Sequence, residues 1–241
     1  ASPTRHAGGA AAGDVNGDGY IDLFIADWRS QSNAEPSDSR LYLNNGDGTF
    51  YDATASSGLV MGNDHRWQPV IADIDRDGDQ DIYSAVDFSA NRLWINNGSG
   101  FFEDKAAETG SANAWNDMGV ALGDPDDDGD FDLYVTNIDG ASTKSILLRN
   151  TSQSPIPSYT EVSQSVGITG GSWGWGTTWL DVDNDGYLDL AHTNGAATSP
   201  WNADVSRLYR NNGGASLSFT DISASAGFND TYWGVGLVAF D

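Results

Sequence analysis

Short runs of apolar residues, rich in β-branched and aromatic side chains, alternate with acidic and glycine-rich segments along the whole chain. One set of runs follows an aspartate, as in Asp22-Leu-Phe-Ile-Ala and Asp132-Leu-Tyr-Val-Thr. Their length and composition predict β-strands rather than helices. A second set leads into an Asn-Gly pair, ending at Gly46, Gly98 and Gly213. Because Asn-Gly readily adopts positive φ angles, each pair predicts a tight hairpin into a third strand.

A further kind of run, made of small residues, stands in front of each acidic segment. These runs are 7–13, 69–72, 118–123 and 176–180. Small side chains suit strands that crowd together, so each unit is predicted to hold four antiparallel strands, as in a β-propeller blade. We therefore predict an all-β propeller in which 1–241 form a single repeat domain. Its blades are expected at approximately 7–58, 66–110, 117–167 and 174–227.

The last residues, 232–241, repeat the run that precedes the fourth acidic segment, since Trp233-Gly234 matches Trp173-Gly174. They predict the first strand of a fifth repeat. A closed four-bladed ring has no place for such a strand, and an unpaired strand edge promotes association. Two explanations stay open. The chain could belong to a longer propeller of about seven blades, or the strand could complete a blade in a neighbouring molecule and build an oligomer or filament.

Four acidic nonapeptides connect the first two predicted strands of the units. They are 14–22, 73–81, 124–132 and 181–189, and they recur at intervals of about 51 to 59 residues. Each carries oxygen side chains at positions 1, 3, 5 and 9, with glycine at position 6 for a sharp turn. Hard cations that need six or more oxygens suit such a set, and calcium is the natural occupant. Without a cation, neighbouring carboxylates would repel by about 4 kcal/mol per pair.

Two alternatives to this type of calcium loop are an EF-hand and a plain polar turn. An EF-hand needs a bidentate glutamate at position 12 and a helix on each side. Position 12 here is occupied by Ile25, Ser84, Val135 and His192, so the EF-hand is excluded. A polar Asp-Gly turn between strands would explain one copy of the motif, but four aligned copies favour a metal site.

Four motifs recur in a fixed order: the acidic loop with its β-run, the Leu-Tyr-x-Asn-Asn-Gly hairpin, the Phe-x-Asp-x-Thr tail and the Trp-Gly strand. Together they resemble FG-GAP repeats of the VCBS and ASPIC/UnbV-associated type, and the loops are similar to those of integrin α propellers. The resemblance covers nearly the whole chain. It implies a β-propeller with about four Ca²⁺ ions, each held between the first two strands of a blade.

Carried over residue by residue, the resemblance implies four sets of metal-binding residues. They are Asp14, Asn16, Asp18, Tyr20 and Asp22; Asp73, Asp75, Asp77, Asp79 and Asp81; Asp124, Asp126, Asp128, Asp130 and Asp132; and Asp181, Asp183, Asp185, Tyr187 and Asp189. The first set has asparagine at position 3 and is expected to bind somewhat more weakly.

The formal net charge of −24 narrows the range of partners. Four bound Ca²⁺ ions would leave the chain strongly acidic, which argues against nucleic acid and anionic membranes, and no membrane insertion is expected. The absence of cysteine excludes disulfides and thiol chemistry. Exposed calcium loops fill at extracellular rather than cytosolic calcium levels. We therefore expect an extracellular or cell-surface location, with the periplasm as an alternative.

The ends of the blades away from the acidic loops are predicted to gather tryptophans and polar side chains. Candidate ligand-binding residues are Trp28, Arg29, Trp67, Trp201 and Asn202. Tryptophans among polar groups can stack on sugars or anchor a protein partner. Packing between blades is the competing explanation, and it is favoured for Trp173 and Trp233. His6 and His65 hold equivalent positions and could share a metal, although exposed histidines are the simpler explanation.

The chain carries none of the common catalytic signatures, such as a nucleophile elbow, a zinc-protease helix or a phosphate loop. The leading hypothesis is a non-enzymatic calcium-binding propeller for adhesion or for recognition of a carbohydrate or an extracellular protein. One alternative is a structural subunit of a filament or surface layer that assembles through its terminal strands. The other is a polysaccharide-acting propeller enzyme, a lyase or dehydratase.

Overall fold

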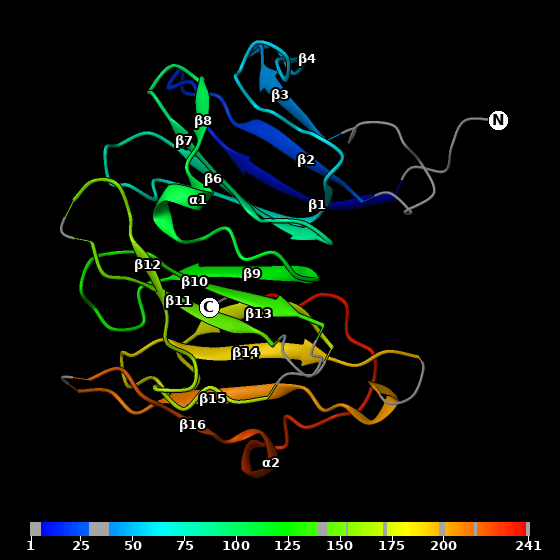
Figure 1. The fold of residues 1–241 in the computed structure, drawn as a ribbon, viewed down its shortest axis with the longest axis vertical. Helices are drawn as coiled ribbons and strands as arrows, with labels where there is room; N and C mark the ends of the chain where they lie inside the picture. Colours follow the sequence, from blue (N-terminus) through cyan, green and yellow to red (C-terminus); the bar gives the residue numbers. More distant parts are fainter. Residues whose placement is uncertain are drawn as a thin grey trace. The chain divides into compact units, whose positions relative to one another are not determined.

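The computed structural model describes residues 6–28, 39–138, 144–152, 154–170, 173–197, 201–214 and 216–239, and the side chains of His6, Ala7 and Trp201 lie outside this description. The described chain is all-β, with four antiparallel sheets of four strands each (Figure 1). It divides into two compact units. Unit 1 comprises residues 1–116 with 152–158, and unit 2 comprises residues 117–151 with 159–241.

Unit 1 contains two sheets in which the strands lie side by side in chain order. The first consists of β1 (His6–Gly13), β2 (Asp22–Trp28), β3 (Arg40–Asn44) and β4 (Phe50–Asp52). The second consists of β5 (His65–Ala72), β6 (Asp81–Asp87), β7 (Arg92–Asn96) and β8 (Phe102–Asp104). One helical turn, α1 (Ala106–Thr109), follows β8. The predicted four-stranded blade is therefore confirmed here, with an acidic nonapeptide between its first two strands.

Unit 2 contains the other two sheets, again in chain order. One consists of β9 (Asp117–Gly123), β10 (Asp132–Asn137), β11 (Ile146–Asn150) and β12 (Tyr159–Glu161). The other consists of β13 (Gly174–Leu180), β14 (Asp189–Asn194), β15 (Arg207–Asn211) and β16 (Phe219–Asp221). A 3-10 turn, η1 (Trp201–Ala203), precedes β15, and a helical turn, α2 (Ser223–Ala226), follows β16. Among the residues described, no helix has the length and apolar character needed to cross a membrane.

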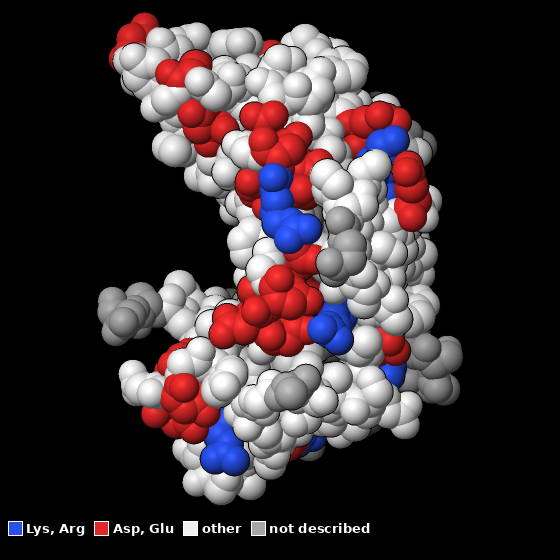
Figure 2. Space-filling model, turned by 90° about the vertical axis from the view of Figure 1, so that its left-hand side faces the viewer, with Lys and Arg blue, Asp and Glu red and all other residues white. Residues whose placement is uncertain are grey.

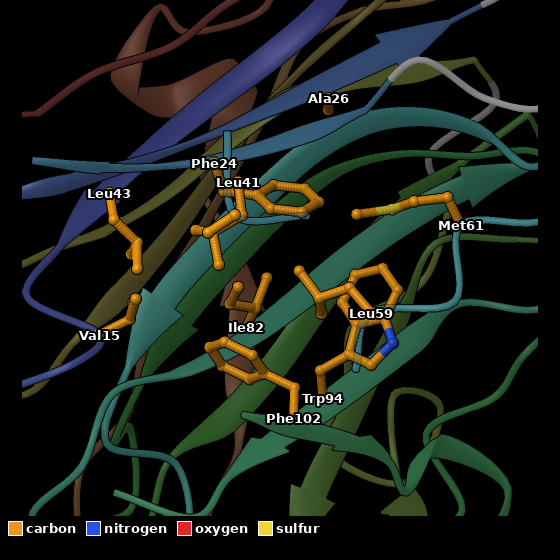
Figure 3. Packing of buried hydrophobic residues seen from close by; sticks show 11 residues of the cluster. Val15, Phe24, Ala26, Leu41, Leu43, Leu59, Met61, Ile82, Trp94 and Phe102 are labelled. Atoms are coloured by element: carbon orange, nitrogen blue, oxygen red, sulfur yellow. The ribbon is translucent and has the colours of Figure 1, made fainter. Parts of the chain in front are cut away.

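The core of unit 1 lies between its two sheets, where β1 and β2 pack on β5 (Figure 3). Phe24 and Leu41 of the first sheet meet Ile82, Trp94 and Phe102 of the second, and all five side chains are almost fully buried. The ring centroids of Phe24 and Trp94 are 5.8 Å apart. Burial of each such side chain stabilises the fold by about 1.5–3 kcal/mol. Neighbouring blades in unit 1 therefore share one core.

The core of unit 2 is built in the same way from β9, β10, β13, β14 and the strands outside them. Tyr134 and Leu147 of one sheet share a cluster with Leu190, Tyr209 and Phe219 of the other. All five are buried. Aromatic residues from both sheets thus fill the space between paired blades in each unit.

Each blade ends on a glycine that the fold requires. Gly58, Gly110, Gly167 and Gly227 have φ angles of 75°, 80°, 90° and 72°. In this left-handed region glycine avoids the steric cost that other residues meet. A Cβ atom at Gly58 would lie 2.6 Å from the Phe102 carbonyl oxygen, and one at Gly167 would lie 2.5 Å from that of Phe219. The glycine therefore also allows the tail of one blade to approach the outer strand of the next.

The segment 232–239 packs on β13 as β13 packs on β9. Thr136 Oγ1 donates a hydrogen bond to the Trp175 carbonyl at 2.6 Å, and Thr193 Oγ1 donates to the Gly234 carbonyl at 2.7 Å. The segment thus has the packing expected of a first strand, but no strand ladder is assigned in its described part. A first strand takes its ladder from the second strand of its own blade, which explains the difference.

Candidate metal centre

The backbone of all four acidic loops follows the same path, with two residues in the left-handed region. At position 4, Gly17, Arg76, Asp127 and Asn184 have φ angles of 70°, 64°, 60° and 58°. At position 6, Gly19, Gly78, Gly129 and Gly186 have φ angles of 88°, 99°, 88° and 90°. Two left-handed residues in such a short stretch turn the chain tightly around the side chains at positions 1, 3 and 5. The sharp turn predicted at the position 6 glycine is confirmed.

The aspartate at position 1 closes each loop onto itself. Its Oδ2 atom accepts a hydrogen bond from the position 6 N–H, with Asp14–Gly19, Asp73–Gly78, Asp124–Gly129 and Asp181–Gly186 distances of 2.8, 3.1, 2.9 and 2.9 Å. In loops 14–22, 124–132 and 181–189 its Oδ1 atom also accepts from the position 5 N–H. Hydrogen bonds of this kind to a carboxylate are charge-assisted and orient the group.

The aspartate at position 9 braces the acidic loop against the β-hairpin of the same blade. The N–H of a hairpin asparagine donates to its Oδ1 atom in every blade. The pairs are Asn44–Asp22 at 2.8 Å, Asn96–Asp81 at 2.8 Å, Asn150–Asp132 at 2.7 Å and Asn211–Asp189 at 2.7 Å. All four aspartates are fully buried. The position 9 carboxylate therefore orders two loops at once.

The carboxylates of three loops converge on a space that could hold one cation. The groups are Asp73, Asp75 and Asp81; Asp124, Asp126 and Asp128; and Asp181, Asp183 and Asp189, and in each the ligand atoms all lie within 4.8 Å of one another. Asp73 Oδ1 and Asp132 Oδ2 are buried oxygens without a hydrogen-bond partner. Oxygens of this kind are the ligands that Ca²⁺ takes. The donor set thus fits a divalent cation.

Burial and mutual repulsion disfavour the charged form of these carboxylates. Burial raises the pKa of Asp75 to about 6, and the neighbouring Asp77 adds to the shift. Burial likewise raises the pKa of Asp81 to about 7 and that of Asp132 to about 8, despite backbone hydrogen bonds that act in the opposite direction. A dication in the loop would reverse this penalty, because it favours the ionised ligands. Figure 2 shows patches of acidic side chains on one face, with a smaller number of basic side chains beside them.

The loop 14–22 is the least charged of the four. Asn16 stands at position 3, where its Nδ2 atom donates to Asp18 at 3.0 Å and its Oδ1 atom accepts from the Asp18 N–H at 3.1 Å. The side-chain amide thus forms these hydrogen bonds within its own loop. Fewer negative ligands lower calcium affinity, which supports the expectation of weaker binding here.

The side chains at position 7 lie against the hairpin of their own blade. A Cβ atom at Gly46 would lie 2.6 Å from the Tyr20 ring, and one at Gly213 would lie 2.5 Å from the Tyr187 ring. Asp79 approaches Gly98 in the same way, at 2.4 Å from such an atom. The glycine of each Asn-Gly turn is therefore needed for contact with the acidic loop as well as for its positive φ angle. Asp130, the fourth residue at this position, is buried.

The hairpin asparagine also joins neighbouring blades, a role that we did not predict. Asn96 Nδ2 donates to the Val15 carbonyl at 2.7 Å, and Asn211 Nδ2 donates to the Pro125 carbonyl at 2.7 Å. Both carbonyls belong to position 2 of the acidic loop in the preceding blade. The sequence held a signal for this role, because Asn150 is present in the third blade although its Asn-Gly turn is lost.

In unit 1 the end of the blades away from the acidic loops carries an aromatic cluster. Trp28 and Trp67 stack with ring centroids 5.2 Å apart, and His65 packs edge-on between Trp28 and Phe88. Phe88 is half exposed and has a φ angle of 65°. A bulky residue in this conformation is strained, and such strain is concentrated at functional sites. Nothing in the sequence indicated Phe88.

A buried carboxylate, Asp87, organises this aromatic cluster. It accepts hydrogen bonds from Trp28 Nε1 at 2.9 Å and from Asn116 Nδ2 at 2.7 Å. Burial raises the pKa of Asp87, while the hydrogen bonds from Asn116, Trp28 and Trp67 act against that rise. The structure thus brings two of the five predicted ligand-binding residues, Trp28 and Trp67, together.

The other three candidate ligand-binding residues do not join this cluster. Arg29 lies outside the described residues, as does the side chain of Trp201. Asn202 is exposed in η1 of unit 2. In unit 2, Trp175 stacks on Trp173 and contacts Trp233, with centroid distances of 6.0 and 5.8 Å, which agrees with the packing role favoured for these tryptophans.

The fold and the loops define a class of protein, namely a repeat protein of four-stranded propeller blades with an acidic loop between the first two strands of each. The sequence model of the FG-GAP-like repeat family matches residues 14–84 and 73–135, and the chain belongs to this family. Among curated proteins, cartilage acidic protein 1 of Homo sapiens is 29% identical over 162 residues. The protein of the same name from Xenopus tropicalis is 29% identical over 160 residues. The matches cover 64% of this chain but only about a quarter of each relative.

Proposed function

We propose that this FG-GAP repeat protein binds calcium in its four acidic loops and uses the ions to hold its blades in a binding-competent form. The convergence of three carboxylates in each of the loops 73–81, 124–132 and 181–189 carries this proposal. Buried oxygens without partners and raised carboxyl pKa values support a resident cation. Calcium is favoured over magnesium because irregular sets of many oxygens suit the larger ion.

Metal binding in this proposal stabilises the fold, because the loops also brace the hairpins through the position 9 aspartates. A ligand that binds only the folded state raises the melting temperature. We expect a higher melting temperature in millimolar calcium than in chelator. Asp183→Ala should reduce the calcium-induced shift, whereas Asp47→Ala, at an exposed hairpin position outside the loops, should leave it intact. Equal melting curves of the parent protein in the two buffers would refute the proposal.

The second part of the proposal is a non-enzymatic role in recognition of a carbohydrate or protein outside the cell. The aromatic cluster with the exposed, strained Phe88 supports a binding surface. Carboxylates that hold calcium are poor acid-base catalysts, which favours binding over catalysis. The low affinity of exposed calcium loops and the relatives named for cartilage support an extracellular location.

A glycan array and an extracellular-protein array, both probed in calcium, test this recognition role. We expect specific hits that are lost in Phe88→Ala and Trp28→Ala. Tyr51→Ala removes another half-exposed aromatic ring of unit 1 and should retain the hits. Hits that remain in both Phe88→Ala and Trp28→Ala would show that the aromatic cluster is not the binding surface. Turnover of a polysaccharide would contradict the non-enzymatic role.

A further inference from the structure

The acidic loop 124–132 differs from the other three at position 2. In loops 14–22, 73–81 and 181–189, the position 2 N–H donates to the Oδ2 atom of the position 9 aspartate, at 3.0, 2.9 and 2.8 Å. Position 2 of loop 124–132 is Pro125, and proline has no N–H. Asp132 Oδ2 is therefore left buried and without a hydrogen-bond partner. The position 9 carboxylate of this loop therefore has fewer hydrogen bonds than its three counterparts.

An arginine of the same blade supplies positive charge to this loop. Arg149, on β11, forms ion pairs with Asp126 and, at 3.5 Å, with Asp128. These two aspartates are two of the three convergent carboxylates of the loop. The side chain of Arg149 is 39% exposed, whereas that of Asp126 is 7% exposed, so the guanidinium reaches in from the surface.

The equivalent positions in the other blades lack this contact. Position 149 precedes the hairpin asparagine, and its counterparts are Leu43, Ile95 and Arg210. Leucine and isoleucine carry no charge. Arg210 is exposed, and in the part of the chain that the structure describes it makes no salt bridge. Loop 73–81 has an arginine of its own, Arg76, at position 4. The arginine that reaches in from the hairpin strand is a feature of loop 124–132, and it accompanies the proline that removes a hydrogen bond from that loop.

We propose that Arg149 is a counter-ion that a calcium ion must displace from loop 124–132. This inference rests on the proposed calcium function. The guanidinium and the ion use the same carboxylates of Asp126 and Asp128. Without calcium, Arg149 offsets part of the negative charge of Asp126 and Asp128, and with calcium it swings out to solvent. Loop 124–132 therefore fills at higher calcium concentration than loop 181–189, which also has four acidic ligands but, in the described part of the chain, no salt bridge to an arginine. It is the exchangeable site of the protein.

Glycine-selective ¹⁵N labelling and NMR test this inference loop by loop. The N–H groups of Gly78, Gly129 and Gly186 each bond to the position 1 aspartate of their own loop, so each resonance reports one site. A calcium titration of the chelator-treated full chain should shift Gly186 before Gly129. In Arg149→Leu the Gly129 midpoint should fall by about fivefold, which corresponds to the loss of about 1 kcal/mol of ion pairing at a partly exposed site. The other midpoints should stay in place.

Arg210→Leu is the matched control, because it removes the same charge at the same position of the neighbouring blade, and it should move no midpoint. A second variant, Arg149→Lys, retains the charge without the planar fork and should fall between the parent and Arg149→Leu. An unchanged or higher Gly129 midpoint in Arg149→Leu would overturn the role of Arg149 alone. If calcium shifted none of the glycine resonances in the parent protein, the calcium function and this inference would fall together.

Discussion

The two ends of the blades are built on different rules. At the acidic end, the same hydrogen bonds recur in all four blades: position 1 aspartate to position 6 N–H, and position 9 aspartate to the hairpin asparagine. At the opposite end the aromatic side chains differ between the two units. Unit 1 has Trp28, Trp67 and Phe88 near Asp87, whereas unit 2 has Trp175 stacked on Trp173 and tilted against Trp233.

The contacts at the acidic end are common to all four blades, so they belong to the repeat fold. The aromatic contacts at the opposite end differ between units, so they are particular to this protein. A short loop that must gather several carboxylates has few solutions, so each repeat converges on the same contacts. The opposite end only has to bury strand ends, which many combinations of side chains can do. Stability should therefore depend most on the acidic end, and ligand specificity on the aromatic end.

The largest effect on stability is expected from the hairpin asparagine. Asn211 is buried, and its side chain donates to the carbonyls of Pro125 at 2.7 Å and Leu188 at 3.2 Å. Asn211→Ala would leave the buried Pro125 carbonyl and the part-buried Leu188 carbonyl without this donor. It should lower the free energy of unfolding by about 3 kcal/mol, measured by urea titration. Asn212→Ala, at the next and exposed position, should cost under about 0.5 kcal/mol. Similar losses of unfolding free energy in the two variants would contradict the proposal that stability depends most on the acidic end.

The pH dependence of stability should depend on a residue that lies between the two ends of the blades. His192 lies in the middle of β14, stacked on Tyr134 and tilted against Tyr209. Burial lowers its pKa to about 3, and Arg207 adds to the fall while Asp221 opposes it. The folded protein keeps the ring neutral, and the unfolded chain takes up a proton below its ordinary pKa of about 6.5. This contribution to stability is complete above pH 6.5 and is lost as the pH falls towards 3.

Urea unfolding in chelator at pH 7.5 and pH 5 measures this contribution. The parent protein should lose about 2 kcal/mol more than His192→Gln over this interval, because only the parent must keep a titratable ring neutral. Equal losses in the two proteins would show that His192 does not titrate in this way. In that case the acid response would belong to the carboxylates of the acidic end.

The smallest effect is expected at Phe88, on the aromatic end. Phe88→Gly removes a half-exposed ring but relieves a left-handed backbone worth about 1–2 kcal/mol. The free energy of unfolding should therefore change by less than about 1 kcal/mol. Phe50→Gly removes a ring of similar exposure from β4, where the φ angle is negative, and should cost more. A larger loss in Phe88→Gly than in Phe50→Gly would mean that Phe88 is structural.

The sequence predicted the features that repeat. Four-stranded blades, Asn-Gly hairpins and the sharp turn at position 6 all follow from local patterns that occur several times, so each copy supports the others. The third blade departs from the hairpin pattern, yet Asn150 still donates to Asp132. The asparagine before the turn was thus the better guide to the structure than the turn itself.

The features that occur once could not be predicted. The contact of Arg149 with Asp126 and Asp128 joins residues more than twenty positions apart, and the consequence of Pro125 depends on a hydrogen bond seen in the other loops. The φ angle of Phe88 is imposed by its surroundings, where its N–H donates to the Trp115 carbonyl at 2.9 Å. Such contacts depend on three-dimensional proximity, and no local pattern specifies them.

Native mass spectrometry of the chelator-treated protein, titrated with calcium, measures the number of bound ions directly. We predict stepwise mass increases that reach four calcium ions, with Asp75→Ala and Asp183→Ala each losing one. A spectrum that stays at the metal-free mass through millimolar calcium would contradict the account.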